Sequence, residues 1–285
     1  MSPVPRIGPA PDDSGSTFDS TVEPGAAVRP RRRGIYVLPN LFTLAALFGG
    51  FYAIVMAMNG RFENAVIGVF CAMVLDSLDG RVARMTHTQS AFGEQMDSLA
   101  DMVSFGAAPA LIVYEWALKG LGKVGWVAAF VYCASAALRL ARFNTNIGVV
   151  DKRWFQGLPS PAAAALVTGF IWVMDDAGFK GVGRIDWLAW SAVAMTLYAG
   201  LTMVTNVPFY SFKDIGHRRS VPFVVLVLIA LGIALVNLHP PLVLFGAFCL
   251  YGLSGYVVYA WRKRQGKPVS VIAISKDEPD ERGLH

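Results

Sequence analysis

The sequence predicts an all-α integral membrane protein with about eight transmembrane helices. Of its 285 residues, 54% are hydrophobic and only 16% are charged, which is typical of polytopic membrane proteins and not of soluble domains. Eight apolar runs each have close to the ~20 residues that an α-helix needs to cross a bilayer. Of the 25 Lys and Arg residues, 20 fall in segments that an even number of spans places on one side of the membrane.

Three parts are expected along the chain. Residues 1–34 are rich in Pro, Gly, Ser and Asp and end in a run of arginines, which predicts a disordered basic cytoplasmic tail. Residues 35–262 are expected to form one membrane domain, and residues 263–285 a cytoplasmic C-terminal tail. No cleavable signal peptide is visible, because the first apolar run begins near Ile35. The predicted spans are roughly 36–58, 64–84, 93–118, 124–145, 160–178, 187–208, 221–238 and 241–262.

The second and third spans carry a group of carboxylates. An ionisable group that faces lipid costs at least ~2.5–3.5 kcal/mol, so these side chains need partners or a function. In helices, the first pair is spaced i, i+3, and the second pair continues an i, i+4, i+8 row that begins at Gly93. A helical hairpin would bring the pairs face to face, where they repel unless hard cations such as Mg²⁺ or Mn²⁺ lie among them. The four residues are Asp76, Asp79, Asp97 and Asp101.

Residues beside these carboxylates suit a phosphate-bearing ligand. Gly80 and Gly93 remove side-chain bulk where a ligand must approach the backbone closely. Arg84, one turn after Gly80, is available for phosphate. A mere network of salt bridges would not explain why two Asp pairs occur at ligand spacing with a glycine in each row.

This spacing resembles the signature of the CDP-alcohol phosphatidyltransferase family, with every fixed position present. The resemblance implies that the four aspartates bind two Mg²⁺ or Mn²⁺ ions and that Asp101 is the general base. It also implies that the CDP group of the lipid substrate, CDP-diacylglycerol, contacts Asp79, Gly80, Ala83 and Arg84. The matching pattern is Asp76-x2-Asp79-Gly80-x2-Ala83-Arg84-x8-Gly93-x3-Asp97-x3-Asp101.

Asn40 has two interpretations. It follows Pro39 at the start of the first span, where a helix N-cap is the ordinary role of Asn. Thr43 lies one turn further on, and in the resembling family the first helix lines the nucleotide pocket. The second candidate role of Asn40 is therefore a contact with the CDP group.

A later segment consists of Leu138-Arg139-Leu140-Ala141-Arg142-Phe143-Asn144, followed by Phe155-Gln156-Gly157-Leu158-Pro159-Ser160-Pro161-Ala162. It resembles one branch of the same family, the bacterial phosphatidylserine synthases. The branch transfers the phosphatidyl group of CDP-diacylglycerol to the hydroxyl of L-serine and releases CMP. The serine carboxylate needs a cation, for which the candidates are Arg139, Arg142, Lys152 and Arg153.

The resemblance also predicts the setting of the enzyme. It implies a homodimer among membrane lipids, in a bacterial inner membrane. The distribution of Lys and Arg predicts that both termini and the site between the second and third spans are cytoplasmic. No nucleic-acid partner is expected. Cys71, Cys133 and Cys249 each fall in a span without a CxxC pair, so neither disulfides nor a zinc site are expected.

Two other functions stay open at this point. The same chemistry could use glycerol 3-phosphate or inositol as acceptor, and only the segment from Arg139 to Ala165 argues for serine. A cation-coupled transporter would also carry carboxylates within its spans. Against a transporter, the aspartates gather toward one membrane face, and neither an inverted repeat nor a broken midplane helix is evident.

Overall fold

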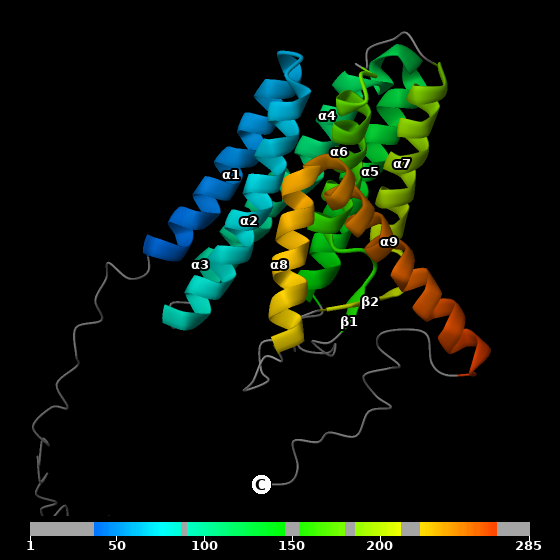
Figure 1. Ribbon diagram of the computed structural model, residues 1–285. Coiled ribbons are helices and arrows are strands. Elements are labelled where there is room, and N and C mark those ends of the chain that lie inside the picture. The colour runs from blue at the N-terminus through cyan, green and yellow to red at the C-terminus, as the bar shows by residue number, and fades with distance from the viewer. Residues whose placement is uncertain (1–36, 87–89, 146–153, 180–185, 212–222, 267–285) are drawn as a thin grey trace, which may run out of the picture. The chain divides into compact units, whose positions relative to one another are not determined.

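The computed structural model describes residues 37–86, 90–145, 154–179, 186–211 and 223–266, all of which belong to the compact unit Gly34–His285. These residues are mostly helical (Figure 1). The longer elements are α1 (Val37–Met58), α2 (Phe62–Thr86), α3 (Ala91–Asp101), α4 (Ala108–Trp116), α5 (Lys123–Thr145), α6 (Ser160–Asp176), α7 (Asp186–Val204), α8 (Phe223–Leu238) and α9 (Pro240–Arg264). Short elements are the π-helix η2 (Met102–Ala107), the 3-10 helix η3 (Leu118–Leu121) and the strands β1 (Trp154–Gln156) and β2 (Pro208–Tyr210).

Each predicted span contains helix in the structure. Within the described residues, five helical segments are long and apolar enough to cross a membrane by themselves. These are Pro39–Met58, Ala91–Trp116, Lys123–Thr145, Trp187–Val204 and Pro240–Arg264. The prediction of a helical membrane protein is confirmed at this level. The count of eight spans stays a prediction, because α2 carries the charged residues of the candidate site and the described parts of α6 and α8 are only 17 and 16 residues long.

The predicted third span consists of three segments, since α3 is followed by the wide turn of η2 and then by α4. Pro109 explains where the helix departs from α-geometry. A proline has no backbone N–H, so the carbonyl of Phe105, four residues earlier, has no α-helical donor. The amide of Ala108 instead donates to the carbonyl of Val103, five residues back.

Two short strands, which the sequence analysis does not predict, pair across a long stretch of chain. β1 and β2 are antiparallel, with Phe155 opposite Phe209. Directly after β1, Gly157 has φ +77°, and a Cβ at this position would lie 2.3 Å from the carbonyl oxygen of Met203 at the end of α7. Glycine is therefore required for the chain to pass this close to α7.

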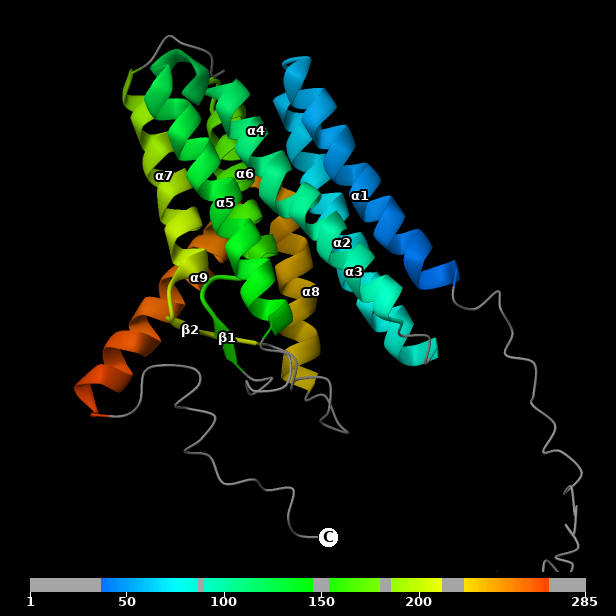
Figure 2. The same ribbon diagram turned by 180° about the vertical axis from the view of Figure 1, so that it is seen from behind.

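Small residues hold α1 and α2 together. A Cβ added to Gly49 would lie 3.2 Å from that of Ala72, and one added to Gly68 would lie 3.1 Å from that of Ala53. Helices in membranes associate through such small residues because these permit close backbone approach. The contact aligns the first turns of α1 with the last turns of α2, where the candidate site lies (Figure 2).

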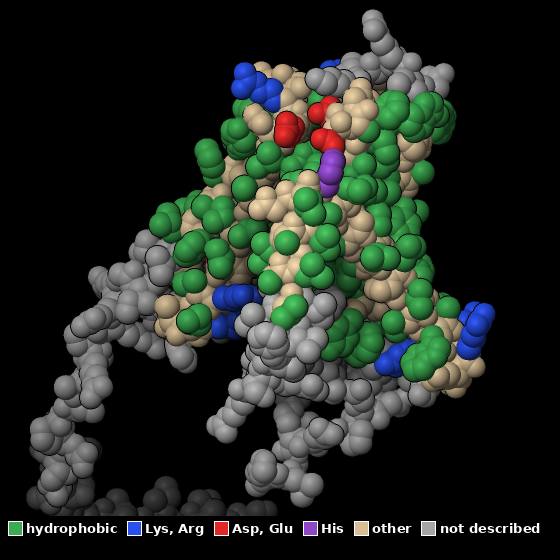
Figure 3. Space-filling model, viewed as in Figure 1, with side chains coloured by type: hydrophobic (Ala, Val, Ile, Leu, Met, Phe, Trp, Pro, Cys, Tyr) green, Lys and Arg blue, Asp and Glu red, His purple; other side chains and the backbone are tan. Residues whose placement is uncertain are grey.

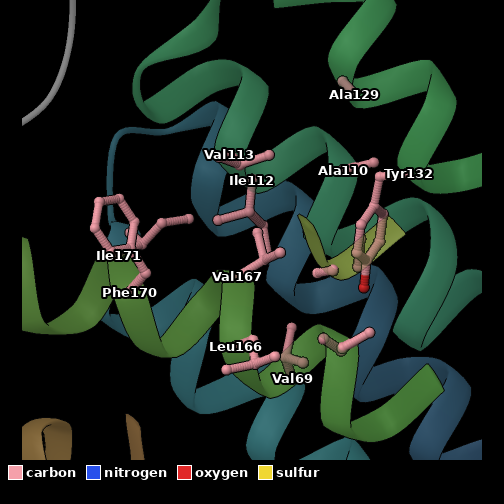
Figure 4. Packing of buried hydrophobic residues seen from close by; sticks show 14 of the residues in the cluster. Val69, Ala110, Ile112, Val113, Ala129, Tyr132, Leu166, Val167, Phe170 and Ile171 are labelled. Atoms are coloured by element: carbon pink, nitrogen blue, oxygen red, sulfur yellow. The ribbon is translucent and has the colours of Figure 1, made fainter. Parts of the chain in front are cut away.

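The core lies among α2, α4, α5 and α6. Val69, Ile112, Tyr132 and Leu166, one from each helix, are almost completely buried and surround the same space (Figure 4). The outer surface is also apolar: hydrophobic side chains cover much of the middle of the face in Figure 3, and Lys and Arg side chains lie toward its two ends. Exposed apolar side chains in such a girdle are what a bilayer covers.

Candidate active site

Three carboxylates converge between α2 and α3. Asp76 of α2 and Asp97 and Asp101 of α3 each offer one carboxylate oxygen, and these oxygens all lie within 4.8 Å of one another. The i, i+4 spacing puts both α3 side chains on one face, and the short distances between the carboxylate oxygens show that this face is turned toward Asp76 of α2. The predicted meeting of the two Asp pairs is thus largely realised.

The donor set fits a hard divalent cation. All donors are carboxylate oxygens, the ligands that Mg²⁺ and Mn²⁺ prefer, and their spacing leaves room for an ion between them. Among the described residues, no Lys or Arg forms a salt bridge with these carboxylates. Three partly buried carboxylates without such a counterion repel one another, so a bound cation would stabilise the arrangement.

Asp79, the fourth predicted ligand, does not belong to this group of three. It is only 5% exposed, and its Oδ2 accepts a hydrogen bond of 2.9 Å from Thr43 Oγ1 of α1. Thr43 is also buried, so the hydroxyl fixes the carboxylate of Asp79 against α1. The structure therefore places Asp79 at the boundary between the cluster and the first helix.

A pocket of about 100 Å³ opens beside the cluster. Asp97 belongs both to the pocket wall and to the group of three carboxylates. The wall comes from the start of α1, the end of α2 and the start of α3 together with the residue before it. It consists of Pro39, Asn40, Thr43, Asp79, Gly80, Ala83, Ser90, Gly93, Glu94 and Asp97.

Two glycines shape this pocket in different ways. A Cβ added to Gly80 would meet nothing within 4 Å, so the space beside it is open. A Cβ added to Gly93 would lie 3.2 Å from Ser90 Oγ and 3.3 Å from Asn40 Oδ1. Ser90 caps α3 by accepting a hydrogen bond of 3.0 Å from the Gly93 amide, so Gly93 permits both the cap and the approach of Asn40.

The predicted nucleotide contacts divide into two groups. Asn40, Asp79, Gly80 and Ala83 meet in the pocket wall. Arg84 is exposed at the end of α2 and is not part of that wall. The alternative role of Asn40 as an N-cap is wrong, because α1 begins at Val37 and Asn40 lies inside the helix.

Arg139 of α5 lies in the interior of the protein. It is 9% exposed, its Nη1 donates to Ser160 Oγ at 2.8 Å, and its charge acts on Asp101. Its Nε is buried and has no hydrogen-bond partner in the described part of the protein. A buried guanidinium N–H without an acceptor has unused capacity to bind an anionic group.

Arg142, one turn after Arg139, has a different environment. Its Nη2 donates to the carbonyl of Gln156 in β1 at 2.9 Å and to that of Met203 in α7 at 3.1 Å. Its Nη1 donates to the carbonyl of Val204 at 3.0 Å. The guanidinium therefore joins the end of α5 to the end of α7 and to β1.

Lys152 and Arg153 lie outside the described residues. The sequence does not predict four further residues at the site, namely Thr43, Ser90, Glu94 and Ser160. Thr43 does follow Asn40 by one turn, and Ser160 belongs to the second matching segment. Their roles depend on contacts between distant helices, which spacing alone does not reveal.

Comparison with known proteins identifies the family. The family model described as CDP-alcohol phosphatidyltransferase matches residues 36–205. A protein named CDP-diacylglycerol–serine O-phosphatidyltransferase from Helicobacter pylori is 36% identical over 220 residues, which cover 77% of this chain and 90% of the relative. Proteins of the same name are 30% identical in Methanocaldococcus jannaschii, over 79% of this chain and 96% of the relative, and in Mycobacterium tuberculosis, over 78% and 79%. With most of the membrane unit and the whole carboxylate cluster inside the matched region, the chain belongs to the CDP-alcohol phosphatidyltransferase family.

Proposed function

We propose that this protein transfers the phosphatidyl group of CDP-diacylglycerol to the hydroxyl of L-serine, giving phosphatidylserine and CMP. The observation that carries the proposal is the convergence of Asp76, Asp97 and Asp101 beside a pocket built by α1, α2 and α3. Relatives that bear the name of this activity cover more than three quarters of the chain at 30–36% identity, and they include bacterial and archaeal proteins.

The reaction is a displacement at the lipid-linked phosphorus. The serine hydroxyl oxygen forms a new bond to this phosphorus, and the bond from phosphorus to the CMP oxygen breaks, so that CMP leaves with the electron pair. Asp101 is the proposed general base and accepts the hydroxyl proton as attack begins. Its carboxylate lies beside those of Asp76 and Asp97, between α2 and α3.

Asp76, Asp79, Asp97 and Asp101 are the proposed ligands of Mg²⁺ or Mn²⁺, in a site for two ions. When bound, such ions neutralise the pyrophosphate charge that repels the nucleophile and stabilise the leaving oxygen. Thr43 of α1 binds one carboxylate oxygen of Asp79, which leaves the other oxygen as the proposed metal ligand.

The pocket is the proposed site of the CDP group. Asn40 supplies the α1 part of its wall, and Asp79, Gly80 and Ala83 lie on the α2 side. The open space beside Gly80 would accept part of the nucleotide close to the backbone. Arg84 lies one turn beyond Gly80, at the end of α2, where its flexible guanidinium is available to a phosphate.

Arg139 is the proposed partner of the serine carboxylate. Its unpartnered Nε and the attraction between its charge and that of Asp101 support this, because the acceptor must place its hydroxyl next to the base. The contacts of Arg142 already account for that residue as a link between α5, α7 and β1. Lys152 and Arg153 stay candidates from the sequence.

The proposed setting follows the sequence analysis. It is a single membrane domain of residues 35–262 with eight spans, in a bacterial inner membrane, flanked by cytoplasmic tails at residues 1–34 and 263–285. We infer that the carboxylate end faces the cytoplasm, where serine is found, and that the protein is a homodimer. The distribution of Lys and Arg supports the orientation, and the family resemblance supports the dimer.

The test is CMP release by the purified protein in detergent with CDP-diacylglycerol and Mg²⁺ or Mn²⁺. Serine, glycerol 3-phosphate and inositol are supplied in parallel, and Asp97→Asn is the inactive comparison. This near-isosteric change removes a ligand charge and should abolish turnover in a folded protein, whereas Asp176→Asn, on α6 next to His239, should not. Release with serine alone supports the proposal. Release with another acceptor keeps the carboxylate site but overturns the acceptor, and no release with any acceptor favours a cation-coupled transporter.

A further inference from the structure

The wide turn η2 begins at the residue after Asp101 and is held from two sides. Tyr132 of α5 is completely buried, and its hydroxyl donates a hydrogen bond of 3.0 Å to the carbonyl of Phe105. On the other side, Ser104 Oγ donates to the carbonyl of Ala46 in α1 at 3.1 Å. The segment that follows the proposed base is thus fixed between two helices.

The hydrogen bond from Tyr132 replaces one that the sequence removes. In an α-helix the carbonyl of Phe105 would accept from residue 109, but Pro109 has no N–H to donate. A buried carbonyl without a donor is destabilising. The Tyr132 hydroxyl satisfies this carbonyl, so the wide turn is stable where Pro109 excludes regular α-helix.

The packing around η2 leaves little freedom for the turn to move. A Cβ added to Gly50 would lie 2.5 Å from Ser104 Oγ, and one added to Gly106 would lie 3.2 Å from the Cβ of Ala136 on α5. Both helices therefore approach η2 at close range. Figure 4 shows the Tyr132 side chain within the buried cluster that includes residues of α4 and α6.

The turn decides the direction in which the carboxylates of α3 point. Ala108 and Ile112 of α4 are fully buried, so packing fixes the orientation of α4. A helix rotates by about 100° per residue, and a π-turn adds one residue to a helical turn. Conversion of η2 to regular α-helix would therefore rotate α3 relative to α4 and carry Asp97 and Asp101 away from Asp76.

We propose that Tyr132 is a positioning residue for the metal site, because its bond to the Phe105 carbonyl holds the turn that directs Asp97 and Asp101 toward Asp76. The inference rests on the proposed metal site and goes beyond it by assigning a role to a side chain on α5 that belongs to neither the cluster nor the pocket wall.

The test measures metal binding without turnover. Thermal unfolding of the purified full-length protein in detergent is followed over a range of Mn²⁺ concentrations, with no lipid substrate. The Mn²⁺ concentration for half-maximal stabilisation should rise roughly tenfold or more in Tyr132→Phe, comparable to the effect of removing a side chain that orients a metal ligand. Tyr198→Phe is the matched control, because Tyr198 is a partly buried tyrosine of α7 whose hydroxyl has no hydrogen-bond partner in the described structure.

The outcomes separate the two proposals. Absence of Mn²⁺ stabilisation in the unmodified protein would overturn the metal site and this inference with it. Stabilisation that is lost in Asp97→Asn but has the same half-maximal concentration in Tyr132→Phe as in the unmodified protein would overturn the positioning role alone. An equal rise in Tyr132→Phe and Tyr198→Phe would also overturn it, since the effect would not be specific to the bond.

Pro109→Ala provides a second variant if Tyr132→Phe does not fold. The alanine restores an N–H that competes with Tyr132 for the Phe105 carbonyl, so regular α-helix becomes accessible. We expect unfolding without metal at an unchanged or higher temperature, together with a raised half-maximal Mn²⁺ concentration. A role in stability alone would not produce this combination, and an unchanged Mn²⁺ response in Pro109→Ala would contradict the inference.

Discussion

At the scale of single residues, the shape of the pocket depends on the missing side chain of Gly80. Its Cβ position is open, although it lies on a helix next to Asp79 and in the wall of the pocket. An interior helical glycine costs about 1 kcal/mol relative to alanine. The presence of glycine here therefore requires another reason, and access of a ligand to the backbone supplies one.

Gly80→Ala should consequently separate stability from binding. We expect an unchanged or slightly higher unfolding temperature, since helix propensity improves without a steric collision, and an increase of about tenfold or more in the KM for CDP-diacylglycerol. Gly246→Ala on α9 is the matched control, because its Cβ would also meet nothing within 4 Å but it lies outside the pocket wall. The KM for CDP-diacylglycerol and the unfolding temperature are measured for both variants by steady-state kinetics and thermal unfolding. An unaltered KM in Gly80→Ala would contradict the proposal that the CDP group occupies the space beside Gly80.

The four aspartates show what residue spacing can and cannot predict. The i, i+4 row of α3 correctly predicts that Asp97 and Asp101 share a face that meets α2. The spacing does not distinguish Asp76, which joins them, from Asp79, which turns to Thr43. That difference depends on Thr43 of α1, which can reach Asp79 because glycines allow α1 and α2 to pack closely.

At the scale of elements, the apolar runs predict the helices well because burial in lipid demands about 20 residues with satisfied backbone groups. They do not predict η2, which departs from the α-helix only locally, although Pro109 inside an apolar run is a recognisable signal. The pairing of β1 with β2 joins three-residue segments that lie far apart in sequence. Such short strands carry no alternating pattern from which they could be recognised.

Arg142 joins several of these elements, and its substitution should affect them together. A lysine offers one ammonium and cannot reproduce the planar donation to carbonyls of β1 and α7. We expect Arg142→Lys to lower stability by about 1 kcal/mol or more and to reduce turnover without a selective rise in the KM for serine. The exposed Arg264→Lys at the end of α9 should change neither.

The measurement for Arg142 compares the KM values for the two substrates with the unfolding temperature. The sequence alone, by contrast, allows Arg142 to hold the serine carboxylate, in which case Arg142→Ala or Arg142→Lys would raise the serine requirement more than that for CDP-diacylglycerol. A selective rise in the KM for serine at unchanged stability would therefore indicate that Arg142 binds the serine carboxylate, and it would contradict the structural role.

At the scale of the whole membrane unit, successive helices return the functional segments to one end. The hairpin between α2 and α3, the start of α1, the end of α5 and the β1–β2 pair lie toward the same end in Figures 1 and 2. The bonds from Arg142 to α7 and β1 and the bond from Arg139 to the start of α6 agree with this. The Lys and Arg pattern predicts the same grouping, because it depends only on the order of spans.

This arrangement predicts which loops are accessible from outside the cell. Asn59 lies in the turn between α1 and α2, and Met85, which is 80% exposed, lies near the end of α2 beside the site. In a background in which Cys71, Cys133 and Cys249 are replaced by alanine, a membrane-impermeant maleimide should label Asn59→Cys in intact cells. It should label Met85→Cys only after permeabilisation. The opposite pattern would place the carboxylate end outside the cytoplasm, and labelling of both in intact cells would mean that α2 does not cross the membrane.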